Sequence, residues 1–289
     1  MRITALRISF SLVLMVGCSR PTRTGPVPQA PVPATSAPVT GAQAPQSWSF
    51  NYQAGIISYQ IVRNATIESV ADSLSSVALD SSQNTAHEVL SLERIGDTIH
   101  FALAVDTFAT TIPGRAGIPQ PTKVPVQIQG WMTRDSLVVT PDSASVGCNP
   151  IKSAAESDLQ TLVVRFPETL TPGMTWQDSV DITACQASIP TTVHISRLFR
   201  VKGEAPSVGS GIVVVERSDS IHAHGEGAQQ QHRVVLDAVG DGTTVYHLST
   251  SDGRLVHANG DQRLDITVVT SENAGHFRQS LKQEVVLIR

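Results

Sequence analysis

The residues that could bind a metal ion lie in one short stretch of the chain. His222 and His224 are separated by a single residue, with Glu226 and His232 close by in the sequence. Residues two apart on a β-strand point to the same face, so the first two imidazoles would lie side by side. However, a structural zinc site needs four ligands, and the two glycines within the stretch favour a solvent-exposed turn. We therefore interpret His222 and His224 as exposed polar side chains and weak metal candidates, and expect no metal or other cofactor.

The candidates for nucleophilic or acid–base catalysis are weaker still. Ser210 lies between two glycines, but its surroundings lack the strand, nucleophile and helix order of a hydrolase and predict a turn. Asp178 with Asp181, and Asp135 with Asp142, are possible carboxylate pairs. The spacing of the first pair puts its members on opposite faces of a strand, which argues against a shared acid–base role. A glycine-rich phosphate loop before a helix is also missing from the sequence. We predict that the chain is not an enzyme.

The chain contains three cysteines, and two of them form a predicted disulfide. Cys148 and Cys185 are the two cysteines of the folded body, and an even pair in an exported protein favours a disulfide. That bond would close a loop of about 37 residues and would stabilise the fold by about 2 to 4 kcal/mol. Neither cysteine belongs to a Cys-x-x-Cys arrangement, so a redox-active pair is not expected.

The amino terminus has the three-part layout of a secretory signal. Arg2 and Arg7 supply positive charge, residues 8–16 are almost all apolar, and Gly17-Cys18 follows at once. A membrane-spanning helix needs about 20 apolar residues, and this run has only about half that number. It therefore predicts export of the chain and not a spanning anchor.

The sequence Leu14-Met15-Val16-Gly17-Cys18 resembles the lipobox of bacterial lipoproteins, although Met15 stands where Leu is more common. The resemblance implies that residues 1–17 are removed and that Cys18, now the first residue, carries a diacylglycerol and an acylated amino group. Two or more acyl chains give durable attachment to a membrane. Ser19 stands where an Asp often retains family members at the inner membrane, so the resemblance implies the outer membrane, on its periplasmic or surface face.

Residues 18–47 form a predicted linker that follows the lipid-bearing cysteine. The segment holds seven of the 17 prolines and has no aromatic residue. It cannot bury enough apolar surface to offset the entropy lost on ordering. In an extended polyproline conformation it would hold the body up to roughly 90 Å from the membrane.

Residues 48–289 have the composition of a folded domain. Their length of about 240 residues suits one large β domain or two small lobes. The net charge of −4 provides no basic excess for a nucleic-acid partner. Aromatic residues make up only 4% of the chain, so the core must consist mainly of Val, Ile and Leu.

Apolar and polar residues alternate along most of this body, which predicts antiparallel strands. The alternation is found in residues 57–63, 99–106, 124–131, 191–201, 211–219, 231–237, 243–249, 255–259, 263–270 and 277–288. Turn signals separate several of these segments, namely Gly96-Asp97, Gly240-Asp241-Gly242, Asp252-Gly253 and Asn259-Gly260-Asp261. We expect the last four strands to form a hairpin meander.

One segment, residues 150–166, has apolar residues at helical spacing. Asn149 is available as the N-cap, Pro150 suits the first turn, and Pro167 would end the helix. Residues 66–79 also fit a helix, but their β-branched and serine-rich composition fits a strand equally well. The sequence leaves that segment open between the two.

A strand opening at Gly55 to Tyr59 is followed by Cys148, a helix and the sequence FPETLTPGMTW at residues 166–176. This order resembles uncharacterised bacterial lipoprotein domains of unknown function. The resemblance implies a strongly curved antiparallel sheet, a half-barrel or open barrel like that of the periplasmic lipoprotein carriers, with one or two helices packed on it. Two lobes meeting near residues 170–175 are a variant of this architecture. The family has no assigned catalytic residues.

Two functional hypotheses from different classes follow. A curved sheet covered by a helix can form a concave apolar pocket, so the chain could bind or carry a lipid or another hydrophobic ligand near the envelope. Alternatively, it could be a structural or assembly lipoprotein that binds another envelope protein through a sheet face or edge strand. A cavity lined by Val, Leu and Ile would favour carriage, whereas a filled core would favour assembly. Fold analogy favours carriage, although no single residue does.

Overall fold

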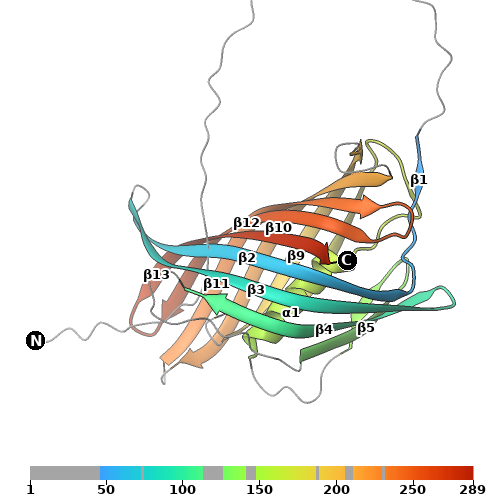
Figure 1. Ribbon diagram of the computed structural model, residues 1–289. Coiled ribbons are helices and arrows are strands. Elements are labelled where there is room, and N and C mark those ends of the chain that lie inside the picture. Colours follow the sequence, from blue (N-terminus) through green and yellow to red (C-terminus); the bar gives the residue numbers. More distant parts are fainter. Residues whose placement is uncertain are drawn as a thin grey trace, which may run out of the picture.

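The computed structural model describes residues 46–72, 75–112, 126–140, 148–186, 189–205, 211–229 and 232–288. Strands make up most of this part of the chain, together with one helix (Figure 1). Several sequence-based predictions lie outside the described residues: the signal segment, Cys18, the linker up to residue 45, Asp142 and Ser210.

Eleven strands form one antiparallel sheet in the order β6-β5-β4-β3-β2-β13-β12-β11-β10-β9-β8. Their bounds are β2 (Gly55–Asp72), β3 (Ser75–Ile95), β4 (Thr98–Thr111), β5 (Val126–Met132), β6 (Leu137–Val139), β8 (Thr175–Gln186), β9 (Ile189–Glu204), β10 (Ile212–Gln229), β11 (His232–Ser249), β12 (Leu255–Thr270) and β13 (Ala274–Ile288). A separate small sheet pairs β1 (Trp48–Ser49) with β7 (Thr169–Leu170).

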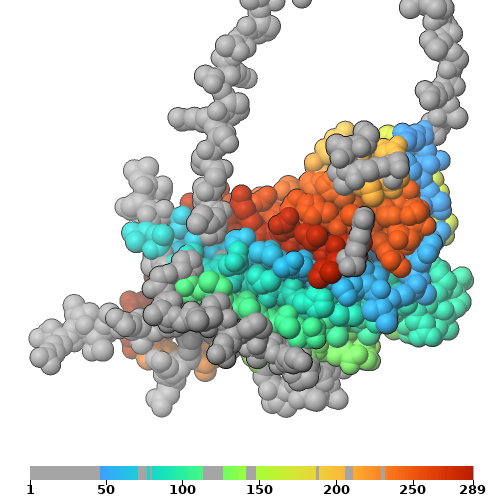
Figure 2. Space-filling view, viewed as in Figure 1, coloured from blue at the N-terminus to red at the C-terminus, as the bar shows by residue number. Residues whose placement is uncertain are grey.

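The first and last strands of the large sheet pair with each other. β2 and β13 run side by side from Ser69↔Phe277 to Ser58↔Ile288, so the blue and red segments are neighbours in Figures 1 and 2. All other neighbours in the sheet are consecutive strands, which confirms the predicted meander of the last four. The strands before and after residues 170–175 belong to the same sheet. Its two edges are β6 and β8.

The sheet curls through 295° into a half-barrel, as the resemblance to the lipoprotein domains implies. Glycine permits this curl where strands approach closely on the inner face. A Cβ atom at Gly240 would collide with the carbonyl oxygen of Arg263, and one at Gly130 would collide with that of Val138. A side chain at either position would therefore force the neighbouring strands apart.

The core lies on the inner, concave face of the sheet. Inward residues alternate with exposed ones along each strand; in β9, Val193, Phe199 and Val201 are buried, whereas His194 and Arg200 are exposed. One cluster fills the end of the half-barrel near Tyr52, and a second of Val, Leu, Ile and Ala covers β9 to β12 at the other end. The outer face is mainly polar.

The helix α1 (Pro150–Leu162) is shorter than the predicted 150–166. It begins as predicted, with Asn149 as N-cap and Pro150 in the first turn, but it ends before Pro167 is reached. Val163 is already extended, and the hydroxyl of Tyr52 both donates to the carbonyl oxygen and accepts from the N–H of Val164, each at 2.9 Å. This tertiary contact replaces the next helical turn, which the sequence could not indicate.

Residues 66–79, which the sequence left open, are strand in their described parts. Gly96-Asp97 and Asp252-Gly253 lie in the predicted turns, and Gly253 has a φ of +65°. The other two predicted turns are wrong. Gly240-Asp241-Gly242 lies within β11 and Asn259-Gly260-Asp261 within β12, each of which is one continuous strand. Of these glycines, Gly240 lies too close to the backbone of Arg263 on β12 to carry a Cβ atom.

Candidate functional site

The two edge strands, β6 and β8, line a gap in the wall of the half-barrel, which we call the opening. A hollow of about 420 Å³ lies in it, bounded by Val139 and Thr140 at the end of β6, by residues 181–185 of β8 and by α1. The helix contacts β8, β5 and β4 from within the curve of the sheet (Figure 1). It therefore forms the floor of the opening.

The amino-terminal end of α1 is fastened to β8. Asn149 Oδ1 accepts the backbone N–H of Ile151 at 3.0 Å and that of Lys152 at 3.1 Å, which satisfies donors of the first turn. The predicted disulfide between Cys148 and Cys185 is present, with a Cα–Cα distance of 5.3 Å. Ser153 Oγ accepts the N–H of Cys185 at 2.9 Å. These contacts close one end of the opening.

We expect replacement of both Cys148 and Cys185 by Ser to lower the free energy of unfolding by about 2 to 4 kcal/mol, because the bond closes a long loop. Urea denaturation under oxidising conditions measures the change. Reduction of the parent should give a similar loss, and reduction of the double variant should give none. Equal stability of the oxidised parent and the variant would contradict the expectation.

An ion pair lies between α1 and the adjoining strands. Arg197 of β9 donates from Nε to Asp178 Oδ1 at 2.6 Å and from Nη2 to Asp178 Oδ2 at 2.7 Å. Arg197 is only 2% exposed, and its Nη1 also donates to the backbone and side-chain oxygens of Gln160 on α1, both at 3.4 Å. This bidentate geometry fixes both charges beneath the helix.

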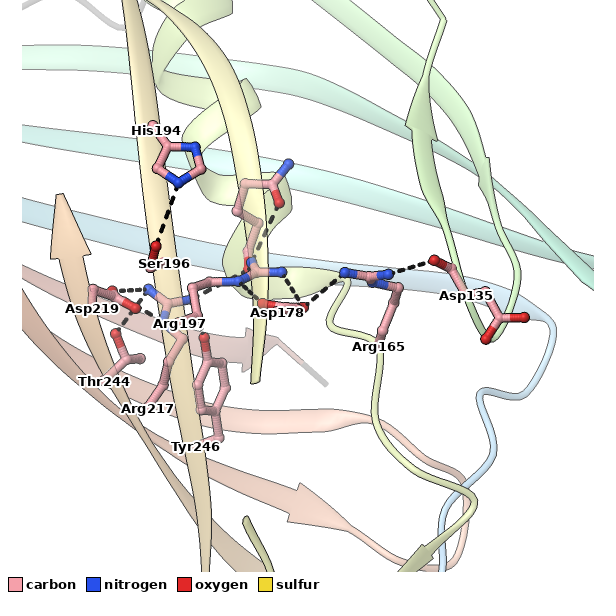
Figure 3. Close-up of polar contacts among 11 residues, drawn as sticks. Asp135, Arg165, Asp178, His194, Ser196, Arg197, Arg217, Asp219, Thr244 and Tyr246 are labelled. Carbon is pink, nitrogen blue, oxygen red and sulfur yellow. Dashed lines mark hydrogen bonds and ion pairs between the residues drawn. The ribbon is translucent and has the colours of Figure 1, made fainter. Parts of the chain in front are cut away.

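Arg217 of β10 extends the same network toward β11. It donates to Asp219 Oδ2 from Nη2 at 2.8 Å and from Nε at 3.1 Å. It also donates to the Tyr246 hydroxyl, to Thr244 Oγ1 and to the carbonyl oxygen of Gln160. Burial raises the pKa of Tyr246, against the opposing effect of Arg217, so the phenol stays protonated. Arg197 and Arg217 thus both donate to the carbonyl oxygen of Gln160 on α1. Figure 3 shows Arg217 with Asp219, Thr244 and Tyr246.

On the opposite wall, the guanidinium of Arg63 on β2 pairs with the carboxylate of Asp158 on α1. Gln283 Nε2 on β13 donates to Asp158 Oδ1 at 2.5 Å. Asp158 is completely buried, so its charge depends on these partners. Arg63, Arg197 and Arg217 each have a carboxylate partner, and they border an interior cavity of only about 50 Å³.

Glu88 of β3 is a fourth buried acid of this interior, with 1% of its surface exposed. Burial raises its pKa from the ordinary 4.5 to about 7, although the charge of Arg63 opposes the rise. The folded protein therefore holds a proton that the unfolded chain releases between pH 4.5 and 7. Stability should fall as the pH rises through this window, by up to about 3 kcal/mol from this group.

A Glu88→Gln variant should lack this dependence. We expect the stability of the variant relative to the parent to increase between pH 4.5 and 8, as measured by urea denaturation at each pH. Glu93→Gln, on the same strand but exposed, is the matched control and should follow the parent. A constant difference between Glu88→Gln and the parent across this range would show that Glu88 does not titrate there.

The other end of the opening is bridged by Arg165, which follows α1. Its Nη1 donates to the carbonyl oxygen of Asp135, in the β5–β6 connection, at 2.7 Å. Its Nη2 donates to Asp178 Oδ2 on β8 at 3.2 Å. Figure 3 shows the guanidinium between these two residues. The opening is thus bounded by the Arg165 bridge at one end and the disulfide at the other.

The candidate histidines lie elsewhere. His222 and His224 are exposed on the outer face of β10, within the strand and not at the predicted turn. They are exposed because they occupy outward positions of a long strand. His224 Nδ1 lies 2.7 Å from Asp237 Oδ1, and His222 is opposite His194 of β9. Among the described residues, no group of three His, Cys, Asp or Glu side chains is placed to hold a metal ion.

The carboxylate pairs do not form a joint site. Asp178 points inward and Asp181 outward, as their spacing predicts. Asp181 instead lies 2.7 Å from Nδ1 of His194. Asp135 contributes its backbone oxygen to Arg165, and its predicted companion lies outside the described residues.

Sequence reasoning missed the buried arginines. Each occupies an inward position of its strand: Arg63 is two residues after Ile61, Arg197 two before Phe199 and Arg217 two after Val215. A charge at an apolar position of a period-two pattern was the available signal. It shows that the group is buried, but the acid that pairs with it comes from another strand or from the helix and depends on the fold.

No family model and no curated protein matches the chain. Solved structures that match include OmpF of Salmonella typhi in complex with daunomycin (6% identity, TM-score 0.25), a BenF-like porin from Pseudomonas fluorescens Pf-5 (7%, 0.20) and the outer membrane protein OpdK from Pseudomonas aeruginosa (9%, 0.17). Each match covers 81% of this chain and 98% or 99% of the other. TM-scores this low carry no argument. Within the described residues, no helix is long and apolar enough to cross a membrane.

Proposed function

We propose that this chain is a non-catalytic, lipid-anchored protein of the cell envelope that binds another envelope protein. The layout of residues 1–18 and the lipobox resemblance support export and acylation of Cys18. Ser19 favours the outer membrane over the inner membrane. The proline-rich segment that follows suits a spacer between the membrane and the half-barrel.

The observation that favours a protein partner over a hydrophobic ligand is the packing of α1 against the concave face. Leu159 and Leu162 of α1 are fully buried against the sheet. The interior cavity beside them holds about 50 Å³ and is bordered by three arginines, which makes it too small and too polar for an acyl chain. A hydrophobic ligand is therefore less well supported than a protein partner, for which the larger hollow at the opening is accessible from outside.

The pairing of the buried charges supports a non-catalytic role. Asp178 accepts hydrogen bonds from both Arg165 and Arg197, and Asp219 accepts two from Arg217. The oxygen lone pairs of these two acids are already engaged by arginine N–H donors, which leaves the acids poorly placed to exchange a proton with a substrate. We assign them to holding α1 in the half-barrel.

The test is native mass spectrometry of the full lipidated chain, purified from its own host in a mild detergent. We expect the mature chain with one other protein in a fixed ratio. Organic extraction of the same preparation is the control for small ligands. A lipid in fixed stoichiometry, with no partner protein, would replace this proposal with the carriage of a hydrophobic ligand.

A further inference from the structure

The β8 edge of the sheet is long and, within the described residues, carries few of the features that block pairing. The strand has 12 residues and contains no Lys, Arg or Pro. In natural proteins, such residues commonly prevent an edge strand from pairing with another chain, or the edge strand is very short. The other edge, β6, is of the short kind, with three residues. Only Asp181 places a charge on the outward side of β8, since Asp178 points inward to Arg197.

The backbone groups of alternate β8 residues point into the opening. Just before β8, Met174 accepts the N–H of Val201 at 2.9 Å, so the even-numbered residues are those hydrogen-bonded to β9. In agreement, the N–H of Cys185 points away from β9, toward Ser153. By this alternation, the N–H and C=O groups of Ser179, Asp181 and Thr183 face the gap.

The gap has the width of one strand. Eleven strands cover the 295° curl in ten steps, which is about 30° for each step. About 65° remains to complete the circle, or roughly two steps. A strand inserted between β6 and β8 would use two steps, because it would have one neighbour on each side.

The contacts at the two ends limit how much chain can enter. Arg165 crosses the gap at Asp178, and the disulfide and Ser153 cover the edge at Cys185. Between them, no described residue covers the edge from residue 179 to residue 183, and the hollow beside it is lined by β8, by the end of β6 and by α1. An extended segment of about five residues fits this length.

We propose that the opening binds one extended segment of another envelope protein, which pairs with β8 and completes the barrel between β8 and β6. This inference rests on the proposed function and specifies the site and the form of the partner. Main-chain hydrogen bonds to an edge strand are an established mode of peptide recognition. A second copy of the chain does not suit the gap, because its own edge strand carries the neighbouring β9 with it.

The Ser179→Pro variant tests pairing at this edge without disturbing the rest of the fold. The substitution removes an N–H that points into the gap, and therefore leaves the β8–β9 hydrogen bonds in place. Ser179→Ala is the matched control, since it keeps the N–H. Both variants should unfold at similar denaturant concentrations, and only the proline variant should lose the partner.

The experiment is photo-crosslinking in host cells that produce the full chain. A benzophenone amino acid is placed at Thr183 on β8, at Val138 on β6 or, as control, at Val239, an exposed residue of β11. We expect one short peptide of one protein to crosslink to both Thr183 and Val138 and not to Val239. With Ser179→Pro, the yield at Val138 should fall at least tenfold, and with Ser179→Ala it should be unchanged.

Strand addition would be overturned by crosslinks at Thr183 to a second copy of this chain, by crosslinks there to lipid alone, or by equal yields in the two Ser179 variants. A partner protein captured at Val239 but not at Thr183 would also overturn it, while leaving the proposed function standing. If native mass spectrometry finds no partner protein at all, the proposed function itself fails.

Discussion

Replacing Cys18 with Ala should prevent acylation of the chain and remove nearly all of it from the membrane fraction. The apolar run before it is too short to span a bilayer, whereas each buried methylene of an acyl chain contributes about 0.8 kcal/mol to attachment. Without the sulfur, no diacylglycerol can be attached. We expect the variant as a soluble or unprocessed protein, at a level at least tenfold lower in washed membranes.

Cell fractionation followed by intact-mass measurement checks this expectation, because acylation and removal of residues 1–17 both change the mass. Ser19→Ala is the matched control and should remain acylated and membrane-bound. Recovery of Cys18→Ala in the same membrane fraction as the parent, at the same yield, would contradict the lipid anchor.

Breaking the buried ion pair should have the largest effect on stability. Asp178→Ala leaves the guanidinium of Arg197, 2% exposed, without its bidentate partner, and also removes the acceptor of Arg165. Loss of one member of a buried pair costs about 3 to 5 kcal/mol. Urea denaturation at neutral pH should show a decrease of this size in the free energy of unfolding.

Asp181→Ala provides the control on the same strand. Its side chain is 72% exposed and pairs only with His194 at the surface, so the change should be within about 0.5 kcal/mol. Replacing Asp178 with Leu and Arg197 with Met in one variant should recover part of the lost free energy of unfolding. Neither charge of this pair is then left buried without its partner. Equal effects of Asp178→Ala and Asp181→Ala would show that the pair does not hold α1.

The antiparallel strands and the helix followed from local patterns, whereas the strong curvature of the sheet was implied by the resemblance alone. Alternation in residues 57–63 and 191–201 identified inward and outward faces, and Asn149 and Pro150 identified the start of the helix. The disulfide followed from two cysteines in a chain whose first residues predict a secretory signal. Each of these features depends on residues close in sequence or on a very small set of possible partners.

Other features depend on contacts that sequence does not reveal. Gly240 and Gly260 resemble turn residues, but in the folded sheet both lie within strands. At Gly240 the backbone of Arg263 approaches too closely for a Cβ atom, a contact that depends on the fold. The pairing of β2 with β13 joins the two ends of the body, and it determines that β6 and β8 become the edges. The opening arises from this order and from the total curl, so no motif marks it.

Hydrogen–deuterium exchange tests most directly whether the partner binds in the opening. The full chain is measured in the complex isolated from its host and again after dissociation of the partner. We expect slower exchange in the complex for peptides covering residues 179–183, with those of β9 and β10 unchanged because their amides are already paired. Unchanged exchange in β8, with protection confined to the outer face of other strands, would contradict binding in the opening.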